Sequence, residues 1–588
     1  MFSRSYVILF IALLLASGSA LGQDPTPTPS PTPSPTATPE VEDKQQVAPD
    51  KLEGVPVIAP NYRSDDRSLP DLGRVGVDML DQRSLTLNDA IRLALENNND
   101  IEVTRHNVKI AEFDLRAARG YYQPRLTGAT YYERATVPNI SFFAPDVTKI
   151  TNGSFVGNAG VRAYIPRFGT VFDVTANNTR LGSDNPVSII SPQFNSNVTA
   201  SVTQPLLRGR GFDQQRRTIE IAKRNLSLTD VQFRQKTIDT IVNVQRAYWD
   251  LAFALRNLQV QRDSVKDAKD QYDHNKRLVE EGQLAPIDIV ASETQVANFE
   301  QGVYEALNVV GQAENALKNL VSPNKNAQIW SESVTPVDPV DITPPDTTLK
   351  EALDAALTNR PELELNQVQR DINAIDRKFY ANQKKPQIDL VASYTSAGVG
   401  GSLNPNFNNP FCRGEGTDPV ACAAALQPLL NNVGSSGSAI SDVFANKYPT
   451  VRVGVQFNLP LFGDKTAGAN YGKSLVEEKK IETQREQLEQ TIQVDVRNAI
   501  QSVRTAEAKL RAAAISRENS VKQYESEQRK LDAGQSDIYK VLERQTALTV
   551  ARSNELRAQT DLNKSIADLQ RATGNSLKAN NVVSVLRK

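Results

Sequence analysis

The pattern of apolar and polar positions changes period along the chain and then starts again. Apolar residues recur at helical spacing from Thr86 or Asn88, the two candidate N-caps, to about residue 121, and Pro124 ends this run. A matching run starts near Thr348 and stops before Pro386. The pattern therefore predicts two equivalent helices far apart in the sequence.

The second half of the chain repeats the first in order. An offset of 262 positions relates Leu87, Ala90, Leu95 and Pro124 to Leu349, Ala352, Leu357 and Pro386. Further along, an offset of 252 relates Val242, Ala247, Gly282 and Gln283 to Val494, Ala499, Gly534 and Gln535. Because a repeat of this length corresponds to a duplicated structural module, we expect one fold built from two similar halves.

After each of the two prolines the period changes to two, which is typical of strands. Alternating runs cover 126–137 and 198–204 in the first half and 388–395 and 451–459 in the second. Residues 161–177 contain an additional hairpin, which belongs either to the same sheet or to a loop. Without that hairpin, the pattern predicts four strands per chain.

Each strand pair ends in a proline, Pro205 or Pro460, and a glycine-containing turn leads into a long helical run. Apolar residues there keep the 3-4 spacing of a coiled coil. A run of about 69 residues would extend roughly 100 Å. A Gly-Gln dipeptide interrupts each of these runs, at 282–283 and at 534–535. Glycine supplies the left-handed residue of a tight turn, so we expect a second helix to return after each dipeptide. These helices are predicted at about 287–320 and 538–571.

The N-terminus has the features of a secretory signal: Arg4, an apolar run at 7–16 and small residues at 17–20. The alternative is a membrane anchor, but a spanning helix needs about 20 apolar residues. Thr, Pro and Ser then dominate 24–40, as in an extended linker. We divide the chain into a signal peptide (1–22), a Pro/Thr-rich disordered extension (23–83), a first repeat (84–321), an inter-repeat linker or equatorial segment (322–347), a second repeat (348–574) and a C-terminal tail (575–588).

Composition excludes some functions. The 67 basic and 68 acidic residues balance, so no basic excess favours nucleic-acid binding. Mean hydropathy is −0.42, yet alternating strands of a membrane barrel leave only a weak hydropathy signal.

Four tyrosines lie close together in the sequence around the first predicted strand: Tyr121, Tyr122, Tyr131 and Tyr132. They form either an interfacial aromatic belt or ordinary packing contacts.

Candidate reactive residues are few. Cys412 and Cys422 share one Gly/Asn/Pro-rich stretch and form either a disulfide or two free thiols. His106 and His274, the only histidines, lie in charged helical patterns and are expected on the surface. No paired-cysteine spacing, phosphate loop or nucleophile elbow occurs in the sequence. We therefore predict that the protein is not an enzyme and has no metal or cofactor.

The predicted strands impose association with other chains. Four strands form an open sheet, and open edges are not tolerated in lipid. The strands must therefore close with those of other copies, and the helical rods should associate with the same symmetry. A membrane barrel continuous with a helical tube would be a conduit.

The chain resembles the TolC-type outer membrane efflux proteins over about residues 84–574. The resemblance rests on the doubled Leu-x-x-Ala-(Ile/Leu)-x-x-Ala-Leu-x-Asn openings at Leu87 and Leu349, on Pro124 and Pro386 before the strands, on the turns at Pro205 and Pro460, and on the two Gly-Gln turns.

This resemblance implies an α+β fold with an internal two-fold repeat. It consists of an outer-membrane β-barrel, with four strands per chain closed as a homotrimer, continuous with a long periplasmic α-helical coiled-coil barrel. The implied function is the exit duct of a tripartite efflux pump or type I secretion system. The implied partners are a periplasmic adaptor, an inner-membrane transporter and outer membrane lipid, and the implied location is the cell outer membrane with a periplasmic extension.

The resemblance also implies site residues near the tight turns. Asp288 and Glu543 fall at acidic positions that face the lumen, and Lys540 stands where relatives often have an Asp. The alternative for these residues is an ordinary solvated helix face. The turns at Gly282, Gln283, Gly534 and Gln535 are expected to contact the adaptor.

A function of another class is a non-conducting periplasmic coiled-coil scaffold or adaptor-like interaction protein. Long helical hairpins fit this function as well. The alternating strands bounded by proline in both halves argue against it, because a soluble scaffold does not need four strands with one apolar face.

Overall fold

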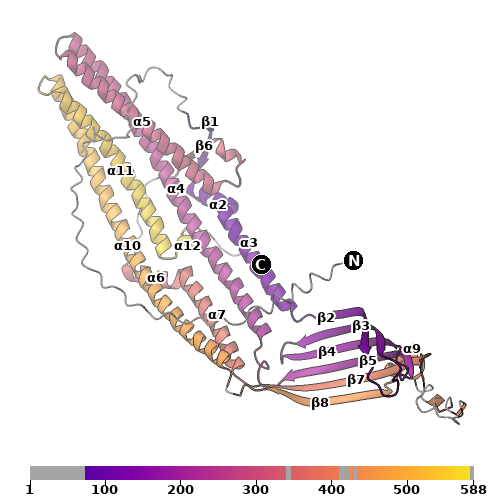
Figure 1. Cartoon of the computed structure of the whole chain (residues 1–588). Helices are drawn as coiled ribbons and strands as arrows, with labels where there is room; N and C mark the ends of the chain where they lie inside the picture. The colour runs from indigo at the N-terminus through magenta and orange to yellow at the C-terminus, as the bar shows by residue number, and fades with distance from the viewer. Residues whose placement is uncertain are drawn as a thin grey trace, which may run out of the picture. The chain divides into compact units, whose positions relative to one another are not determined.

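Long helices and antiparallel strands alternate twice along the chain in a computed structural model (Figure 1). The structure describes residues 73–582 apart from 340–342, 344–345, 409–417, 419, 422–423, 426, 429–432 and 462. The predicted signal peptide, the predicted extension up to residue 72, and Cys412 and Cys422 lie outside the described residues.

The first half contains β1, two short helices, four strands and a long helical hairpin. The elements are β1 (Asp78–Leu85), α2 (Leu87–Asn97), α3 (Asn99–Gly120), β2 (Arg125–Pro138), β3 (Lys149–Ile165), β4 (Thr170–Ser183), β5 (Ile190–Pro205), α4 (Gln214–Glu280) and α5 (Pro286–Val321). A 3₁₀ turn, η3 (Gln328–Trp330), and β6 (Glu332–Pro336) lead toward the second half.

The second half repeats this order with two strands. Its elements are α6 (Leu349–Asn359), α7 (Pro361–Gln383), β7 (Gln387–Leu403), α9 (Ser436–Phe444), β8 (Tyr448–Asn458), α10 (Lys465–Asp532), α11 (Ile538–Ala572) and α12 (Ser576–Ala579). The long helices α4 and α10 have 67 and 68 residues, as the coiled-coil period predicts.

The strands other than β1 and β6 form a six-stranded antiparallel sheet in the order β2-β3-β4-β5-β7-β8, and the pair β5–β7 joins the two halves. The prediction of four strands per chain is therefore wrong, because the hairpin at 161–177 belongs to the sheet as part of β3 and β4. These two strands are also longer than predicted. Small residues hide the alternation of β3, where Gly153, Gly157 and Ala159 occupy positions of the same face as Val161.

Three local predictions also need correction. The first predicted helix is two helices, because Asn98 ends α2 and its side chain then caps α3 by accepting from Asp100 N–H. In the second half Pro361 starts α7 and separates it from α6. Residues 78–83 of the predicted disordered extension belong to β1, which pairs in parallel with β6. Thr86 is confirmed as the N-cap of α2.

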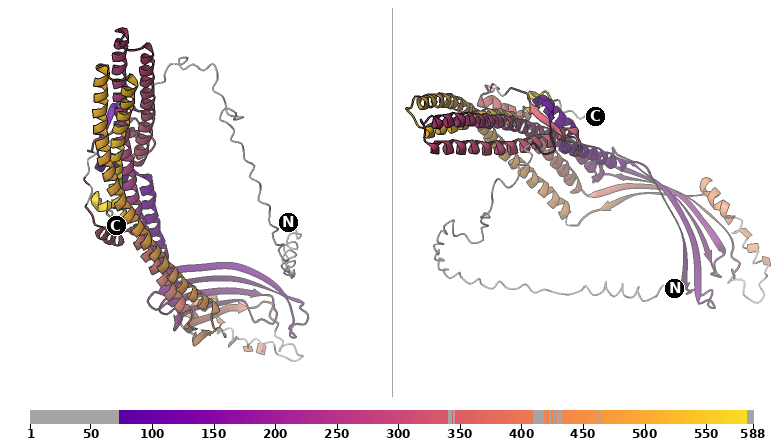
Figure 2. Two further views of the ribbon diagram at one scale, coloured as in Figure 1. Left: turned by 90° about the vertical axis from the view of Figure 1, so that its left-hand side faces the viewer. Right: turned by 90° about the horizontal axis from the view of Figure 1, so that it is seen from above.

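The long helices pack through the predicted apolar positions. Helix α4 contacts α5 and α11, and α10 contacts α11, so the four run side by side (Figure 2). The side chains of Ile241, Val244 and Leu251 in α4 are at most 1% exposed, and those of Ile492 and Val496 in α10 are fully buried. Burial of this apolar surface is the main stabilisation of the helical region.

A buried ionic cluster connects β6 and the residues before β1 to α5. Glu314 accepts from Val334 N–H (2.9 Å) and pairs with Lys318 (3.2 Å) and Arg74 (3.0 Å). Lys318 is fully buried and also donates to the carbonyl of Trp330 (3.2 Å). The cluster satisfies charges that would otherwise be costly inside the protein.

Replacing Glu314 with Ala should leave the Lys318 ammonium buried without its carboxylate. We expect a loss of about 3–5 kcal/mol in the free energy of unfolding, seen as a lower thermal midpoint of the purified protein. As a control, Lys522→Gln breaks an exposed pair with Glu518 and should barely change the midpoint. Equal midpoints for the two variants would contradict a stabilising role of the cluster.

Candidate functional site

The register of the sheet separates one apolar face from one polar face. Side chains of directly paired residues lie on the same face. One ladder across all six strands consists of Leu126, Val161, Val174, Ala200, Tyr394 and Val451. Most of these apolar side chains are solvent-exposed in the single chain. On β8 the same face continues with Val453, Val455 and Phe457, each more than half exposed.

The neighbouring ladder, one residue along each strand, lies on the opposite face and is polar. It consists of Thr127, Gly160, Thr175, Thr199, Thr395 and Thr450. On this face Arg162 pairs with Asp173 (2.7 Å), and the hydroxyls of Thr199 and Thr395 are 2.9 Å apart. A sheet with these two faces is suited to separate lipid from an aqueous path.

The four tyrosines proposed for an aromatic belt do not lie on one face of the sheet. Tyr121 and Tyr122 pack against each other at the end of α3, and Tyr121 also contacts Tyr164. Tyr131 and Tyr132 are consecutive in β2 and therefore point to opposite faces. Only Tyr132 lies on the apolar face.

Both strand-to-helix turns follow the predicted prolines. After Pro205, Leu206 N–H donates to the Ile388 carbonyl (2.8 Å), and Asp213 caps α4. After Pro460, Gly463 adopts φ +75° and Asp464 caps α10. Arg208 lies 3.6 Å from Asp464, so an ion pair connects the two turns. This ion pair joins the segments that lead into α4 and α10, and α7 packs against both helices.

The two helix-hairpin ends have the same backbone geometry. Gly282 and Gly534 adopt φ +73° and +68°. In each turn the glycine N–H donates to a carbonyl three residues earlier, and the following glutamine N–H donates to one five residues earlier, both at 2.8–3.0 Å. This is the Schellman arrangement, which needs a left-handed residue. All four turn residues, including Gln283 and Gln535, are exposed.

Of the gate candidates, Asp288 has a structural contact. Its carboxylate accepts from Ala285 N–H (3.1 Å) and so caps the first turn of α5, where Pro286 is the first helical residue. Glu543 is exposed, and no hydrogen bond or ion pair to another described residue involves it. The structure does not bring Asp288 and Glu543 into contact within one chain.

Lys540 is paired with an acidic residue that the sequence analysis missed. Its ammonium lies 3.1 Å from the carboxylate of Asp537, the N-cap of α11. The hydrogen bond from Lys540 lowers the pKa of Asp537, and the same contact raises the pKa of Lys540. The Ser-Asp sequence just before α11 is an N-cap signal that points to Asp537. The second hairpin end therefore carries an acidic group beside its lysine.

Polar side chains connect the two hairpins near these ends. Gln295 of α5 donates to Thr546 of α11 (2.8 Å). Nearby, Ser264 and Thr549 share a buried hydroxyl contact of 2.8 Å between α4 and α11. These polar contacts lie between the apolar clusters next to α2 and α6 and a further apolar cluster of Leu531, Ile538, Val541 and Leu542 beside the second hairpin turn.

Among the described helices, none has a stretch long and apolar enough to cross a membrane. In the same residues, no group of three or more His, Cys, Asp or Glu side chains is arranged to hold a metal ion. His106 lies 3.7 Å from Glu102 and His274 lies 3.1 Å from Asp532. Both contacts join side chains at the surface of helices.

Three solved structures that share this fold are outer membrane channels. The CmeC outer membrane channel of Campylobacter jejuni is 16% identical, with 83% of this chain and 86% of that chain covered and a TM-score of 0.57. The outer-membrane channel OprN is 15% identical, with 88% and 99% covered and a TM-score of 0.58. The open-state MtrE outer membrane channel of Neisseria gonorrhoeae is 16% identical, with 87% and 95% covered and a TM-score of 0.54.

No curated protein sequence matches the chain. The family model described as "Outer membrane efflux protein" matches residues 157–322 and 352–575, which include most of both repeats. This match confirms the resemblance, the α+β fold class and the outer membrane location. The matched family consists of channels and not of enzymes. Membership of this family implies that the chain assembles as a trimer. The chain belongs to the outer membrane efflux protein family and is an outer membrane efflux channel of tripartite pumps.

Proposed function

We propose that three copies of this chain close their six-stranded sheets into one barrel and form a passive exit duct. The open edges of the sheet carry the proposal. β2 and β8 are the outer strands, and nearly every residue of both is exposed. β2 leads away from α3 and β8 leads back to α10, so β8 of one copy runs antiparallel to β2 of the next.

The apolar ladder with Leu126 and Val451 then faces lipid, and the threonine ladder with Thr127 and Thr450 faces the lumen. Three six-stranded sheets make a barrel of about eighteen strands rather than twelve. Because barrel diameter grows roughly linearly with strand number, the lumen is about 1.5 times as wide as that of a twelve-stranded barrel. A wider duct would accommodate bulkier cargo.

Conductance in planar bilayers tests the proposed duct. The purified protein should run as a heat-modifiable trimer from the outer-membrane fraction and conduct ions. Replacing residues 139–189 with a short turn removes β3 and β4, and should lower open-state conductance by roughly half, as the cross-section falls.

Exclusion of polymers of graded size from the intact channel gives a second measure of width, which does not depend on the deletion variant folding. A monomeric product without conductance would refute the duct, and a twelve-strand width would refute the eighteen-strand barrel.

We place the periplasmic gate at the hairpin ends, with Asp288 and Glu543 as the charges that concentrate cations there. The exposed, unpaired carboxylate of Glu543 supports this role. Lys540 does not cancel these charges, because Asp537 pairs with it. Rings of carboxylates at a constriction attract cations and repel anions.

The double substitution Asp288→Asn and Glu543→Gln should lower the cation preference, measured as a smaller reversal potential in a salt gradient. The introduced asparagine keeps an acceptor for Ala285 N–H, so the cap of α5 is maintained. The control Lys522→Gln, on the exposed side of α10, should leave the reversal potential unchanged. An unchanged potential in the double variant would remove both residues from the gate.

The exposed turns at Gln283 and Gln535 are the proposed contact for the periplasmic adaptor. The inner-membrane transporter would then bind the channel through this adaptor. A photocrosslinking residue at Gln283 or Gln535 should capture a periplasmic protein with long helical hairpins, identified by mass spectrometry of the crosslinked band. The same residue at Lys325, in the loop after α5, serves as control. Equal capture from all three positions would argue against contact at the turns.

A further inference from the structure

Helix α9 lies directly on the apolar face of the sheet. Gly398 and Gly400 of β7 permit this approach, because a Cβ atom at either position would overlap a carbonyl oxygen of Ala439 or Ser435. The Ser396 hydroxyl donates to the Val443 carbonyl (2.6 Å). Ser396, Gly398 and Gly400 share the face of Tyr394, which is the apolar one. Helix α9, in the connection between β7 and β8, therefore lies on the surface that we assign to lipid.

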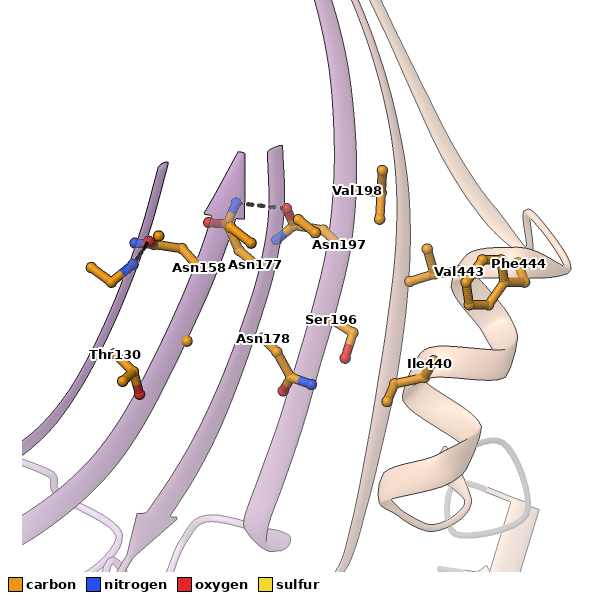
Figure 3. A pocket seen from close by; sticks show the side chains of 15 residues that line it. Thr130, Asn158, Asn177, Asn178, Ser196, Asn197, Val198, Ile440, Val443 and Phe444 are labelled. Atoms are coloured by element: carbon orange, nitrogen blue, oxygen red, sulfur yellow. Dashed lines mark hydrogen bonds between the residues drawn. The ribbon is translucent and has the colours of Figure 1, made fainter. Parts of the chain in front are cut away.

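The side chains of α9 form one wall of a groove on this face (Figure 3). Val443 is buried, whereas Phe444 is 84% exposed and Ile440 is 47% exposed. The floor is made by small residues of β2 to β5, among them Ala159 and Ala176. The volume is about 600 Å³, within the range of small-molecule pockets. The exposed surface of the groove is mostly apolar, and the groove is open to solvent.

Polarity changes in order along the apolar face, through the groove and beyond its outer end. Farthest from the helices, and outside the residues that line the groove, Arg180 of β4 is paired in register with Phe194 of β5. The next pair on this face, closer to the helices, is Asn178 of β4 and Ser196 of β5. The pair after it, closer still, is Ala176 of β4 and Val198 of β5. All three pairs lie on the apolar face, so a cationic level, a hydrogen-bonding level and a hydrocarbon level follow one another.

Ser196 gives an independent indication of a ligand. It lines the groove, is 7% exposed, and its hydroxyl has no hydrogen-bond partner among the described residues. An unsatisfied buried hydroxyl is costly unless a ligand or water completes its hydrogen bond. Arg180 is exposed and forms no ion pair with a described residue.

We infer that this groove binds a phosphorylated, acylated lipid of the outer leaflet. The acyl chain lies against Ala176, Val198 and the apolar side chains of α9. The carbonyl of its ester or amide linkage accepts from Ser196 and Asn178, and its phosphate binds Arg180. This inference rests on the proposed placement of the apolar face toward lipid. It assigns α9 to holding one lipid molecule against the channel wall.

The orientation of the levels selects this class of ligand. The apolar pair lies nearer the middle of the sheet, and Arg180 lies nearer the end away from the helices. A lipid of the outer leaflet has the same order, because its acyl chains extend into the membrane and its headgroup is at the outer surface. Arginine binds phosphate with paired N–H donors. A soluble anionic cargo would meet the polar face instead, where Arg452 of β8 lies beside the threonine ladder.

Native mass spectrometry of the purified trimer with added diphosphorylated lipid A tests the inference. The wild type should retain lipid A in preference to phosphatidylethanolamine. Arg180→Gln should weaken retention about tenfold, the effect of losing a charged hydrogen bond. Ser196→Ala should weaken it less, and Ala176→Trp, which fills the groove, should abolish it. Arg452→Gln removes a matched arginine from the opposite face and should leave retention unchanged.

Equal retention by Arg180→Gln and Arg452→Gln would overturn the inference, as would absence of any preference for lipid A. Retention of the deacylated, phosphorylated headgroup as strongly as intact lipid A would also overturn it, because the acyl groove would then contribute nothing. Bilayer conductance of the same samples separates the two proposals: a conducting trimer without lipid preference would refute only the lipid site, and a non-conducting product would refute the duct.

Discussion

Backbone hydrogen bonding in hydrocarbon is the constraint on which the rest of the structure depends. A strand edge exposed to lipid leaves N–H and C=O groups without partners, and each such group costs several kcal/mol. The sheet of this chain has two such edges, β2 and β8. When identical copies close into a ring, β8 of one copy pairs with β2 of the next, and no further strand is needed to cover either edge. Because β5 and β8 continue into α4 and α10, the symmetry that closes the strands also arranges the long helices around the same axis.

The register of the sheet converts this closure into a conduit. A shift of one residue in any strand would exchange its apolar and polar faces. The ladder with Leu126 and the ladder with Thr127 remain separate across all six strands, so the faces are defined along the full width of the sheet. The loop helix α9 adds a covered strip on the apolar face, and it can approach only because Gly398 and Gly400 have no side chain.

Much of this architecture was predictable where a local signal is strong. Gly282 and Gly534 predict the hairpin turns because few other residues tolerate their positive φ. Thr86 predicts the start of α2 because its hydroxyl satisfies a free N–H of the first turn. The first part of β3 was missed because Gly153 and Gly157 weaken the alternation, and β1 was missed because its partner β6 lies about 250 residues away. At the candidate gate, Asp288 and Lys540 were placed at the hairpin ends, whereas the contact of Lys540 with Asp537 was not foreseen.

The sequence by itself determined the duplication, the long coiled-coil helices, the strand-to-helix turns and the family, because periodicity, proline and glycine act over a few neighbouring residues. Only the tertiary structure decided the number of strands, the buried cluster around Glu314 and Lys318, and the position of α9 on the apolar face. These features depend on pairing between residues far apart in the chain. Such pairing is set by the register and packing of whole elements, which no short stretch of sequence encodes.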